Sequence, residues 1–393
     1  MRLRFPGTTA FALCVCVLLA VAGPAAADEN SDVGTLVAGA VQPAIAQYGI
    51  PGMAVGIVVD GRSYVYNYGV MSKATGQPVT DETLFEIGSI SKTFTATLAS
   101  YAQATGHLSL ADSASRYLPV LRGSSFDRVS LLNLGTHTSG GLPLQLPDEI
   151  QNDAQLMRYF QTWKPLCEPG ACRTYSNPGI GLLGVIAAKS LHADFAALME
   201  RRLFPMLGLQ HAYIDVPATE TTHYAQGYTS ADAPVRMAPG VLAPEAYGVR
   251  TTARDMTRFV ADNMGLFALD PTLQRALVAT HTGYFGLGAM TQDLIWEQYR
   301  YPAALQDLLA GNSGRMSLQA NPATRLTPPL RPQDDVLINK TGSTYGFGAY
   351  VVFIPKKKLG VILLANKNYP IAARVTTAYS ILTKLEAEVA KAR

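Results

Sequence analysis

The chain has 393 residues, with 32 basic and 29 acidic side chains and a formal net charge of +3. This length allows about two or three domain-sized units, and the composition is that of an ordinary globular protein. The nearly balanced charge gives no electrostatic argument for binding nucleic acid or an anionic membrane, so neither partner is expected.

The N-terminus has the pattern of a secretory signal peptide. Two arginines lie within the first four residues, and an unbroken apolar run follows at 10–22, which is too short to span a membrane. Small residues at 24–27 suit cleavage before Asp28. We therefore predict a cleaved signal at 1–27 and a periplasmic protein without stable membrane association; a buried N-terminal helix is the alternative. Cleavage would leave a net charge of +1.

Two cysteines remain in the predicted mature chain. Cys167 and Cys172 enclose a Pro-Gly turn signal, and an oxidising compartment favours a disulfide between them over two free thiols. The six histidines are scattered and show no zinc-type spacing. No metal or cofactor is expected.

The first elements are a helix and a β-hairpin. Apolar residues recur at helical spacing over 33–48, where Pro43 could kink the helix. Strands are expected at 54–59 and 63–68, joined by an Asp60-Gly61 turn. Alternating tyrosines in the second strand should pack on one face.

The middle of the chain is mostly helical. Helices are expected at about 89–101, 110–117, 131–136, 153–163, 179–191 and 254–264. Residues 214–250 contain many turn formers and little periodicity, and an irregular segment of that length is often functional.

The C-terminal third returns to strands and ends in a helix, expected at 336–340, 348–354, 359–365 and 372–390. Three consecutive lysines at 356–358 form a hairpin tip in this interpretation.

This order predicts an α/β (α+β) fold, with a central, mainly antiparallel sheet flanked by helices and an inserted all-helical domain. The expected division is a discontinuous α/β domain at 28–105 and 209–393, and a helical domain at 106–208.

The segment 85–94 holds the first chemical motif. A strand-like run ends at Gly88, and a helix-like run begins at Ser89, three residues before Lys92. On a helix this spacing places both side chains on one face. The positive end of the helix suits an oxyanion, so the segment could supply a nucleophile, a basic partner and part of an oxyanion hole. Alone, an S-x-x-K match is more simply an exposed helix start.

Tyr175 begins a second motif, Y-x-N, and Lys340 begins a third motif, K-T-G. Two ammonium groups near a tyrosine would lower its pKa, so that the phenol could act as general base and then as general acid. Each residue alone could be structural, as a core tyrosine or a surface lysine. The three motifs in this order make coincidence implausible.

Other residues of these motifs have matching chemistry. Asn177 can contact an amide, while Lys340, Thr341 and Ser343 could bind a carboxylate. The backbone N–H groups of Ser89 and Ser343 could form the oxyanion hole. Gly342 would let a substrate approach the strand closely.

S-x-x-K, Y-x-N and K-T-G, in that order, resemble the penicillin-recognising serine enzymes. Longer stretches resemble the class C β-lactamases, the periplasmic cephalosporinases, and the resemblance covers nearly the whole mature chain. These stretches are 85–95, 140–145, 247–249, 340–348 and 364–370. The resemblance implies a sheet domain and a helical domain with the site at their junction.

The resemblance also implies roles. Ser89 would be the acylated nucleophile, and Lys92 and Tyr175 would carry protons, with the base in each step left open. The implied substrate contacts are Asn177 and Gln145 to the side-chain amide of a β-lactam, Tyr247 lining the pocket, and Lys340, Thr341, Ser343 and Arg374 to its carboxylate. The implied partner is a small β-lactam substrate bound by a monomer, without metal or cofactor.

Three features depart from the family pattern. Ile371 stands where many members carry asparagine, which puts carboxylate affinity in question. Tyr345 occupies a position where smaller or amide residues are common, and it could narrow the site. The Cys167–Cys172 pair is unusual, and a disulfide there would stiffen the approach to Tyr175 or stabilise a surface loop.

Rival functions use the same chemistry. A D-alanyl-D-alanine carboxypeptidase would attack a peptide with the same residues, and a carboxylesterase on this fold is a third possibility; the difference lies in deacylation. The motif at Tyr175 is not Ser-Asp-Asn, which argues against a class A enzyme, and no G-x-S-x-G occurs. A catalytically inactive binder of cell-wall peptides would have no chemical reason to keep the nucleophile with both proton carriers.

Overall fold

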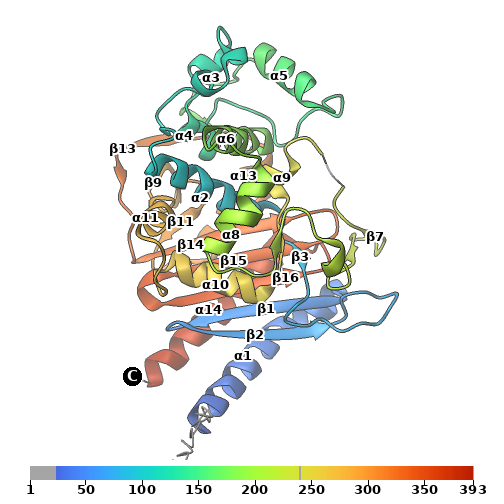
Figure 1. Ribbon diagram of the computed structural model, residues 1–393. Helices are drawn as coiled ribbons and strands as arrows, with labels where there is room; N and C mark the ends of the chain where they lie inside the picture. The colour runs from blue at the N-terminus through green and yellow to red at the C-terminus, as the bar shows by residue number, and fades with distance from the viewer. Residues whose placement is uncertain (1–23, 239, 393) are drawn as a thin grey trace, which may run out of the picture.

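The computed structural model describes residues 24–238 and 240–392 (Figure 1). Most of the predicted signal peptide lies outside the described residues, and its last residues, 24–27, fall within helix α1 (Pro24–Tyr48). The helix predicted at 33–48 is confirmed, and it continues through Pro43. Within the described chain, no single helix is long and apolar enough to cross a membrane; α6 (Asn177–Ser190) and the chain at Phe195–Met206 pass only together, as a pair bent by 74°.

A nine-stranded sheet forms the centre of the described chain, and every neighbouring pair of strands in it is antiparallel. In spatial order its strands are β13 (Thr324–Leu330), β9 (Gly283–Leu287), β10 (Met290–Gln292), β11 (Glu297–Arg300), β14 (Val336–Ser343), β15 (Gly348–Ile354), β16 (Leu359–Ala365), β1 (Gly52–Val59) and β2 (Arg62–Gly69). The five strands predicted from the sequence are confirmed. The hairpin turn at Asp60 and Gly61 has positive φ at both residues, as the Asp-Gly pair favours.

The sheet separates two hydrophobic cores. Along β1, Ala54 and Val58 join one core, while Met53, Val55 and Ile57 join the other, because successive side chains of a strand point to opposite faces. Helices α1 and α14 (Ile371–Ala392) cover the second face, and α10 (Ala253–Asn263) lies on the first (Figure 1). The tyrosines of β2 pack against the second core, as predicted.

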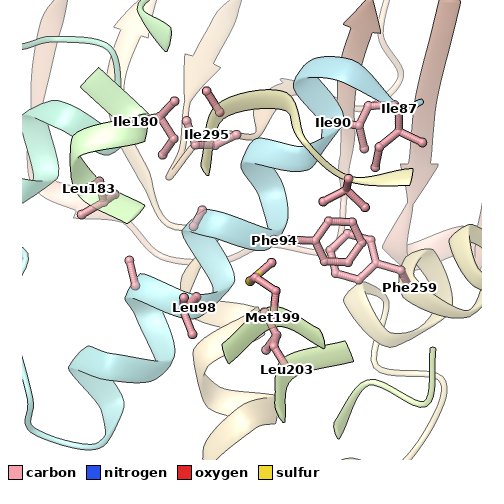
Figure 2. Packing of buried hydrophobic residues seen from close by; sticks show 14 of the residues in the cluster. Ile87, Ile90, Phe94, Leu98, Ile180, Leu183, Met199, Leu203, Phe259 and Ile295 are labelled. Atoms are coloured by element: carbon pink, nitrogen blue, oxygen red, sulfur yellow. The ribbon is translucent and has the colours of Figure 1, made fainter. Parts of the chain in front are cut away.

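Helix α2 (Ser91–Ala104) runs through the larger core. All twelve side chains of Ser91–Ala102 are buried, so the helix is enclosed on every side. Phe94 stacks on Phe259 of α10 with ring centroids 4.1 Å apart (Figure 2). A helix buried on all faces has little freedom to shift, and its N-terminal end is therefore a rigid platform for the site.

The remaining helices are mostly short. They are α3 (Ala114–Tyr117), α4 (Leu131–Gly135), α5 (Asp153–Thr162), α6, α7 (Phe195–Leu198), α8 (Phe204–Met206), α9 (Ala243–Tyr247), α11 (Pro271–Ala279), α12 (Leu305–Gly311) and α13 (Gly314–Leu318). Between residues 106 and 208 the regular elements of the described chain are helices, apart from β4 (Cys172–Arg173), and long loops join them. Helices α3 and α5 of this part lie above the sheet in Figure 1. The domain boundaries stay a prediction.

Some sequence expectations were wrong in extent. The helix predicted at 110–117 covers only Ala114–Tyr117, because the carbonyls of Leu110 and Asp112 accept hydrogen bonds from the start of α4 and are not available to a helix. The segment 214–250 is irregular as expected, but it contains two short strands, β6 (Gly227–Tyr228) and β7 (Pro234–Val235), and α9. Strands β9, β10, β11 and β13 were not foreseen, since they are short or contain proline.

The predicted disulfide is present between Cys167 and Cys172. It closes a surface loop whose Leu166 and Cys167 N–H groups both donate to the carbonyl of Gly140, at 2.7 and 3.3 Å. Cys172 lies in β4, which pairs with β12 (Asn321–Pro322). The bridge therefore joins a loop that rests on Gly140 to the strand that precedes Tyr175.

We expect the double variant Cys167→Ala/Cys172→Ala to lose about 2 kcal/mol of unfolding free energy, because a short cross-link removes a modest amount of chain entropy from the unfolded state. Urea unfolding followed by circular dichroism measures this loss. Reduced wild-type protein is the matched control and should behave like the double variant. Equal stability of the oxidised wild type and the variant would contradict the prediction.

Candidate active site

Ser89 lies in a 3-10 turn, η1 (Gly88–Ile90), and not in the α-helix proper, which begins at Ser91. The Lys92 ammonium donates hydrogen bonds of 2.8 Å to Ser89 Oγ and of 2.8 Å to the Ala246 carbonyl. Lys92 is completely buried, and burial followed by repulsion from Lys340 lowers its pKa to about 8, although Tyr175 opposes that shift. The structure thus brings Ser89 and Lys92 together as the S-x-x-K spacing predicted.

Two glycines allow η1 to approach β14 without a gap. A Cβ at Gly342 would lie 1.9 Å from the Ile87 carbonyl oxygen, and Gly88 has φ +52° with its Cβ position 2.5 Å from the Ser343 nitrogen. Strand β11 pairs with β14 only as far as Asn339, so the following edge of β14 faces η1. The backbone N–H groups of Ser89 and Ser343 therefore belong to two segments in direct contact.

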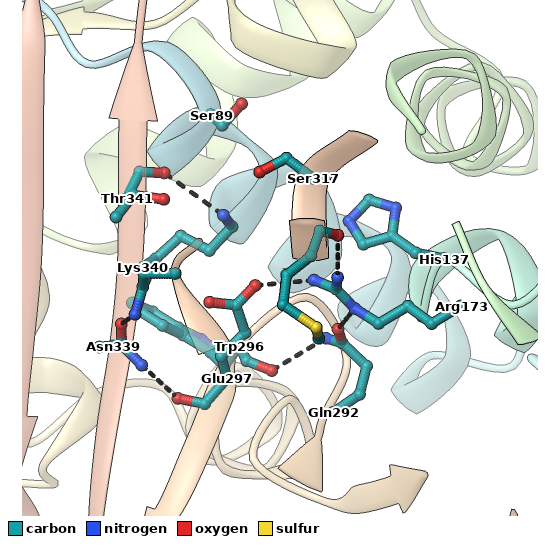
Figure 3. Close-up of polar contacts among 12 residues, drawn as sticks. Ser89, His137, Arg173, Gln292, Trp296, Glu297, Ser317, Asn339, Lys340 and Thr341 are labelled. Carbon is teal, nitrogen blue, oxygen red and sulfur yellow. Dashed lines mark hydrogen bonds and ion pairs between the residues drawn. The ribbon is translucent and has the colours of Figure 1, made fainter. Parts of the chain in front are cut away.

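Lys340 points from β14 into the same site (Figure 3). It is 1% exposed, and its ammonium donates to the Thr341 carbonyl at 3.3 Å. Thr341 and Ser343 are half-buried at the open side of the strand. The alternation of the strand thus sends Lys340 inward and leaves two hydroxyl groups for a ligand.

Arg374 lies behind Ser343 and not at the surface of the site. It is fully buried, and its Nη1 donates to the Gly342 carbonyl at 2.7 Å and to Ser343 Oγ at 2.8 Å. Burial lowers its pKa to about 10, so it stays charged at neutral pH. In this arrangement the guanidinium of Arg374 meets the site through its hydrogen bond to Ser343 Oγ.

Tyr175 is held by His137 on both sides. The Thr174 N–H donates to the His137 carbonyl at 2.8 Å, and the Ser176 N–H donates to His137 Nδ1 at 3.1 Å. The imidazole also packs on the phenol ring, with centroids 4.2 Å apart. Burial, followed by nearby positive charges, holds the pKa of His137 well below its usual range, so the ring stays neutral and accepts at Nδ1.

The Tyr175 hydroxyl is buried and makes no well-aligned hydrogen bond to any described residue. Lys340 Nζ lies 5.0 Å and Lys92 Nζ 5.2 Å from the centroid of its ring. Burial raises the pKa of Tyr175, but Lys340, Lys92 and the nearby Ser89 hydroxyl outweigh it and lower the pKa to about 8. Tyr175 and Lys92 then share protons near pH 8 and titrate as a coupled pair.

The other predicted contact residues surround this centre. Asn177 begins α6, is 7% exposed and has its side-chain oxygen buried without a partner among the described residues. Gln145 is exposed on the loop whose Leu144 carbonyl accepts from the Asn177 N–H at 3.0 Å. Tyr247 ends α9, directly after the Ala246 carbonyl that binds Lys92, and is half-buried.

Two of the departures from the family pattern lie close in sequence to Ser343 and Arg374. Tyr345 is 80% exposed in the turn between β14 and β15, next to Tyr247, whose pKa is raised by burial and by Tyr345. Ile371 begins α14 and is half-buried against the second core. The described residues contain no cluster of three or more His, Cys, Asp or Glu side chains that could hold a metal ion.

Sequence reasoning missed three participants. The Ala246 carbonyl orients Lys92, His137 fixes Tyr175, and Arg173 lies with its guanidinium carbon 5.5 Å from the centre of the Tyr175 ring. A backbone carbonyl leaves no sequence signal. His137 stands before Gly140-Gly141 in a segment of small polar residues, which was the one available hint.

Comparison with known proteins identifies the class. The β-lactamase family model matches residues 37–386. A β-lactamase from Pseudomonas fluorescens is 51% identical over 356 residues, which is 91% of this chain and 99% of the relative. A β-lactamase from Lysobacter lactamgenus is also 51% identical, over 91% and 92% of the two chains. The chain belongs to the β-lactamase family.

Solved structures narrow this assignment. A class C β-lactamase in complex with cefoxitin superposes with a TM-score of 0.89 at 52% identity, covering 91% of this chain and 99% of that one. A protein described as D-alanine carboxypeptidase AmpC, from Burkholderia cenocepacia, gives a TM-score of 0.87 at 56% identity, with the same coverage. The predicted fold is confirmed, and the protein is a hydrolase of the class C β-lactamase group.

We expect Gly342→Ala to lower kcat/KM at least about 100-fold, because the new Cβ would push β14 away from η1 and misplace the reacting groups. Gly286→Ala, on β9 of the same sheet, is the matched control, since its Cβ would have no neighbour closer than 3.9 Å. Hydrolysis of a chromogenic cephalosporin measures both variants. A Gly342→Ala enzyme with wild-type kinetics would contradict the geometry.

Tyr175 should ionise near pH 8, about two units below an ordinary tyrosine. The absorbance at 295 nm of the wild type minus that of Tyr175→Phe isolates this phenol, and every other shifted tyrosine pKa is raised. Because the base forms as a proton leaves the pair, kcat/KM should rise with pH up to about 8 and then level off. A difference spectrum that appears only above pH 10 would contradict the prediction.

Proposed function

We propose that this protein hydrolyses the β-lactam amide of cephalosporins and penicillins through an acyl-enzyme on Ser89. One observation carries the proposal. The Ser89 hydroxyl lies 2.8 Å from the ammonium of Lys92, a fully buried lysine whose pKa is lowered to about 8, beside Tyr175, whose pKa is also lowered to about 8. A nucleophile with a base available near neutral pH is the requirement for covalent catalysis on an amide.

Acylation follows from this geometry. The Lys92–Tyr175 pair takes the proton of Ser89 Oγ as the oxygen attacks the amide carbonyl. The oxyanion that forms is stabilised by the N–H groups of Ser89 and Ser343, which lie on the two segments that meet at Gly342. Tyr175 then gives a proton to the leaving nitrogen, because its hydroxyl has no fixed partner that would hold it elsewhere.

The site suits a substrate with a carboxylate. Lys92, Lys340 and Arg374 are each at most 1% exposed, and none of them forms an ion pair with a described carboxylate. The hydroxyl groups of Thr341 and Ser343 are the accessible donors in front of these charges. We propose that they bind the substrate carboxylate, while Asn177 and Gln145 bind its side-chain amide and Tyr247 lines the pocket where the deacylating water attacks.

A D-alanyl-D-alanine carboxypeptidase is the second candidate, because one neighbour at 56% identity is described as a D-alanine carboxypeptidase. Both reactions share acylation of Ser89 and recognition of a carboxylate. They differ in how fast water releases the acyl group, and the β-lactamase relatives favour rapid release.

We also propose that residues 1–27 direct the enzyme to the periplasm, because they combine a basic start with an apolar run and small residues. We propose that it acts there as a monomer, as the resemblance to the class C enzymes implies.

Ser89→Ala should lower cephalosporin turnover by about three orders of magnitude or more, because Ser89 is the serine among the described residues whose hydroxyl accepts a hydrogen bond from the Lys92 ammonium. Ser89 is half-buried and small, so the thermal midpoint should stay close to that of the wild type. Hydrolysis assays and thermal unfolding of the same sample measure both. Appreciable turnover by a folded Ser89→Ala protein would refute the nucleophile assignment.

Intact mass spectrometry with excess cephalosporin, run in parallel with β-lactam absorbance, separates the two candidates. Loss of many substrate equivalents with recovery of free enzyme is expected. A persistent one-to-one adduct on Ser89 would favour the carboxypeptidase, and neither adduct nor loss would leave only an esterase or an inactive binder.

A further inference from the structure

Arg173 is the centre of a buried polar network beside Tyr175. Its guanidinium donates to Gln292 Oε1 at 2.6 Å, to Glu297 Oε1 at 2.8 Å and to the Met316 carbonyl at 2.9 Å (Figure 3). Arg173 is 1% exposed and Glu297 is 4% exposed. One side chain therefore connects β4, β10, β11 and helix α13.

Three positive groups surround the Tyr175 ring, but they differ in how their charge is balanced. Lys340, Lys92 and Arg173 lie 5.0, 5.2 and 5.5 Å from its centroid. Of these three, only Arg173 forms an ion pair with a described carboxylate, that of Glu297. A buried pair of this kind is rarely favourable for stability alone when compared with apolar side chains, so its place beside the proton carrier calls for a functional reason.

We infer that Arg173 and Glu297 are a positioning pair, in which Arg173 fixes the Tyr175 ring and Glu297 offsets the charge of Arg173, so that Lys92 and Lys340 are the main positive charges that act on the proton of Tyr175. This inference rests on the proposed function only for the use of that proton in catalysis. Neither residue touches the reacting atoms in the arrangement described above.

The charges that face Tyr175 come from every element packed against it. The charged groups are Lys92 from α2, Lys340 from β14, Arg173 from β4 and Glu297 from β11. The His137 ring, which follows α4, also packs on Tyr175 but is neutral. Asp293 faces Glu297, and burial followed by the charge of Glu297 raises the pKa of Asp293 well above its usual range. Glu297 is the carboxylate that forms the ion pair with Arg173 in this set.

Position and charge are coupled through the chain. Arg173 is held by the pairing of β4 with β12, directly after the Cys167–Cys172 bridge, and Tyr175 follows two residues later. The bond from Arg173 to the Met316 carbonyl also ties this strand to α13, which carries Ser317 toward the site (Figure 3). A shift of Arg173 would therefore also shift Tyr175 or helix α13.

The sign of each charge change follows from Coulomb's law. Glu297→Gln keeps an oxygen for Arg173 but removes the negative charge, so Arg173 would act on the phenol uncompensated. The pKa of Tyr175 and the acid limb of kcat/KM should both fall, by about one pH unit. Adding Arg173→Gln to this variant removes the remaining charge and should return both toward the wild-type values.

The experiment is the 295 nm titration of each variant against the same variant carrying Tyr175→Phe, together with the pH profile of kcat/KM. Asp262→Asn is the matched control, since Asp262 is a fully buried partner of Arg258 away from the site. This variant should change neither the Tyr175 titration nor the pH profile of kcat/KM. If Glu297→Gln does not fold, the double variant can still overturn the inference, because the inference requires it to keep the wild-type titration.

A lower Tyr175 pKa in Glu297→Gln with recovery in the double variant supports the inference. An unchanged titration in Glu297→Gln, or a double variant shifted as far as the single one, overturns it, even if catalytic rates fall. Because the titration does not depend on turnover, it is separate from the Ser89→Ala test: an active Ser89→Ala enzyme would remove the proposed function without changing the titration result.

Discussion

Two ammonium groups buried beside one phenol are the constraint on which the rest of the site depends. Lys92 and Lys340 are at most 1% exposed, and neither is neutralised by a described carboxylate. An uncompensated buried charge costs several kcal/mol, and proteins relieve that cost by shifting pKa values. The pKa values of Lys92 and Tyr175 are both lowered to about 8, which reduces the cost of burying these charges. The same shifts supply the base that Ser89 requires.

The fold tolerates this cost because rigid elements hold each group. Lys92 lies on a helix enclosed in the larger core, and Lys340 on a central strand of the sheet. Tyr175 is fixed through both of its neighbours by His137. The backbone contact at Gly342 keeps these elements in register, so the site needs no ordering when a substrate arrives.

Most of the fold was predictable because its hydrophobic periods are clear. The long helices α1, α2, α6 and α14 and the strands near the two ends of the chain show regular spacing and strong turn signals. The missed strands β9, β10, β11 and β13 are short or interrupted by proline, and they are strands only because neighbours pair with them. The helix predicted at 110–117 is shorter than expected, because the carbonyls of Leu110 and Asp112 accept hydrogen bonds from the start of α4.

The sequence by itself determined which chemistry is available: Ser89, Lys92, Tyr175 and Lys340 carry it in motifs whose order is specific, and Cys167 and Cys172 are the natural pair. Only the tertiary structure decided which partners tune that chemistry. Arg173, Glu297 and the Ala246 carbonyl reach the site from distant segments, and Arg374 lies behind Ser343 and not in front of it. Electrostatic tuning depends on distances and burial across the fold, and a one-dimensional pattern contains neither.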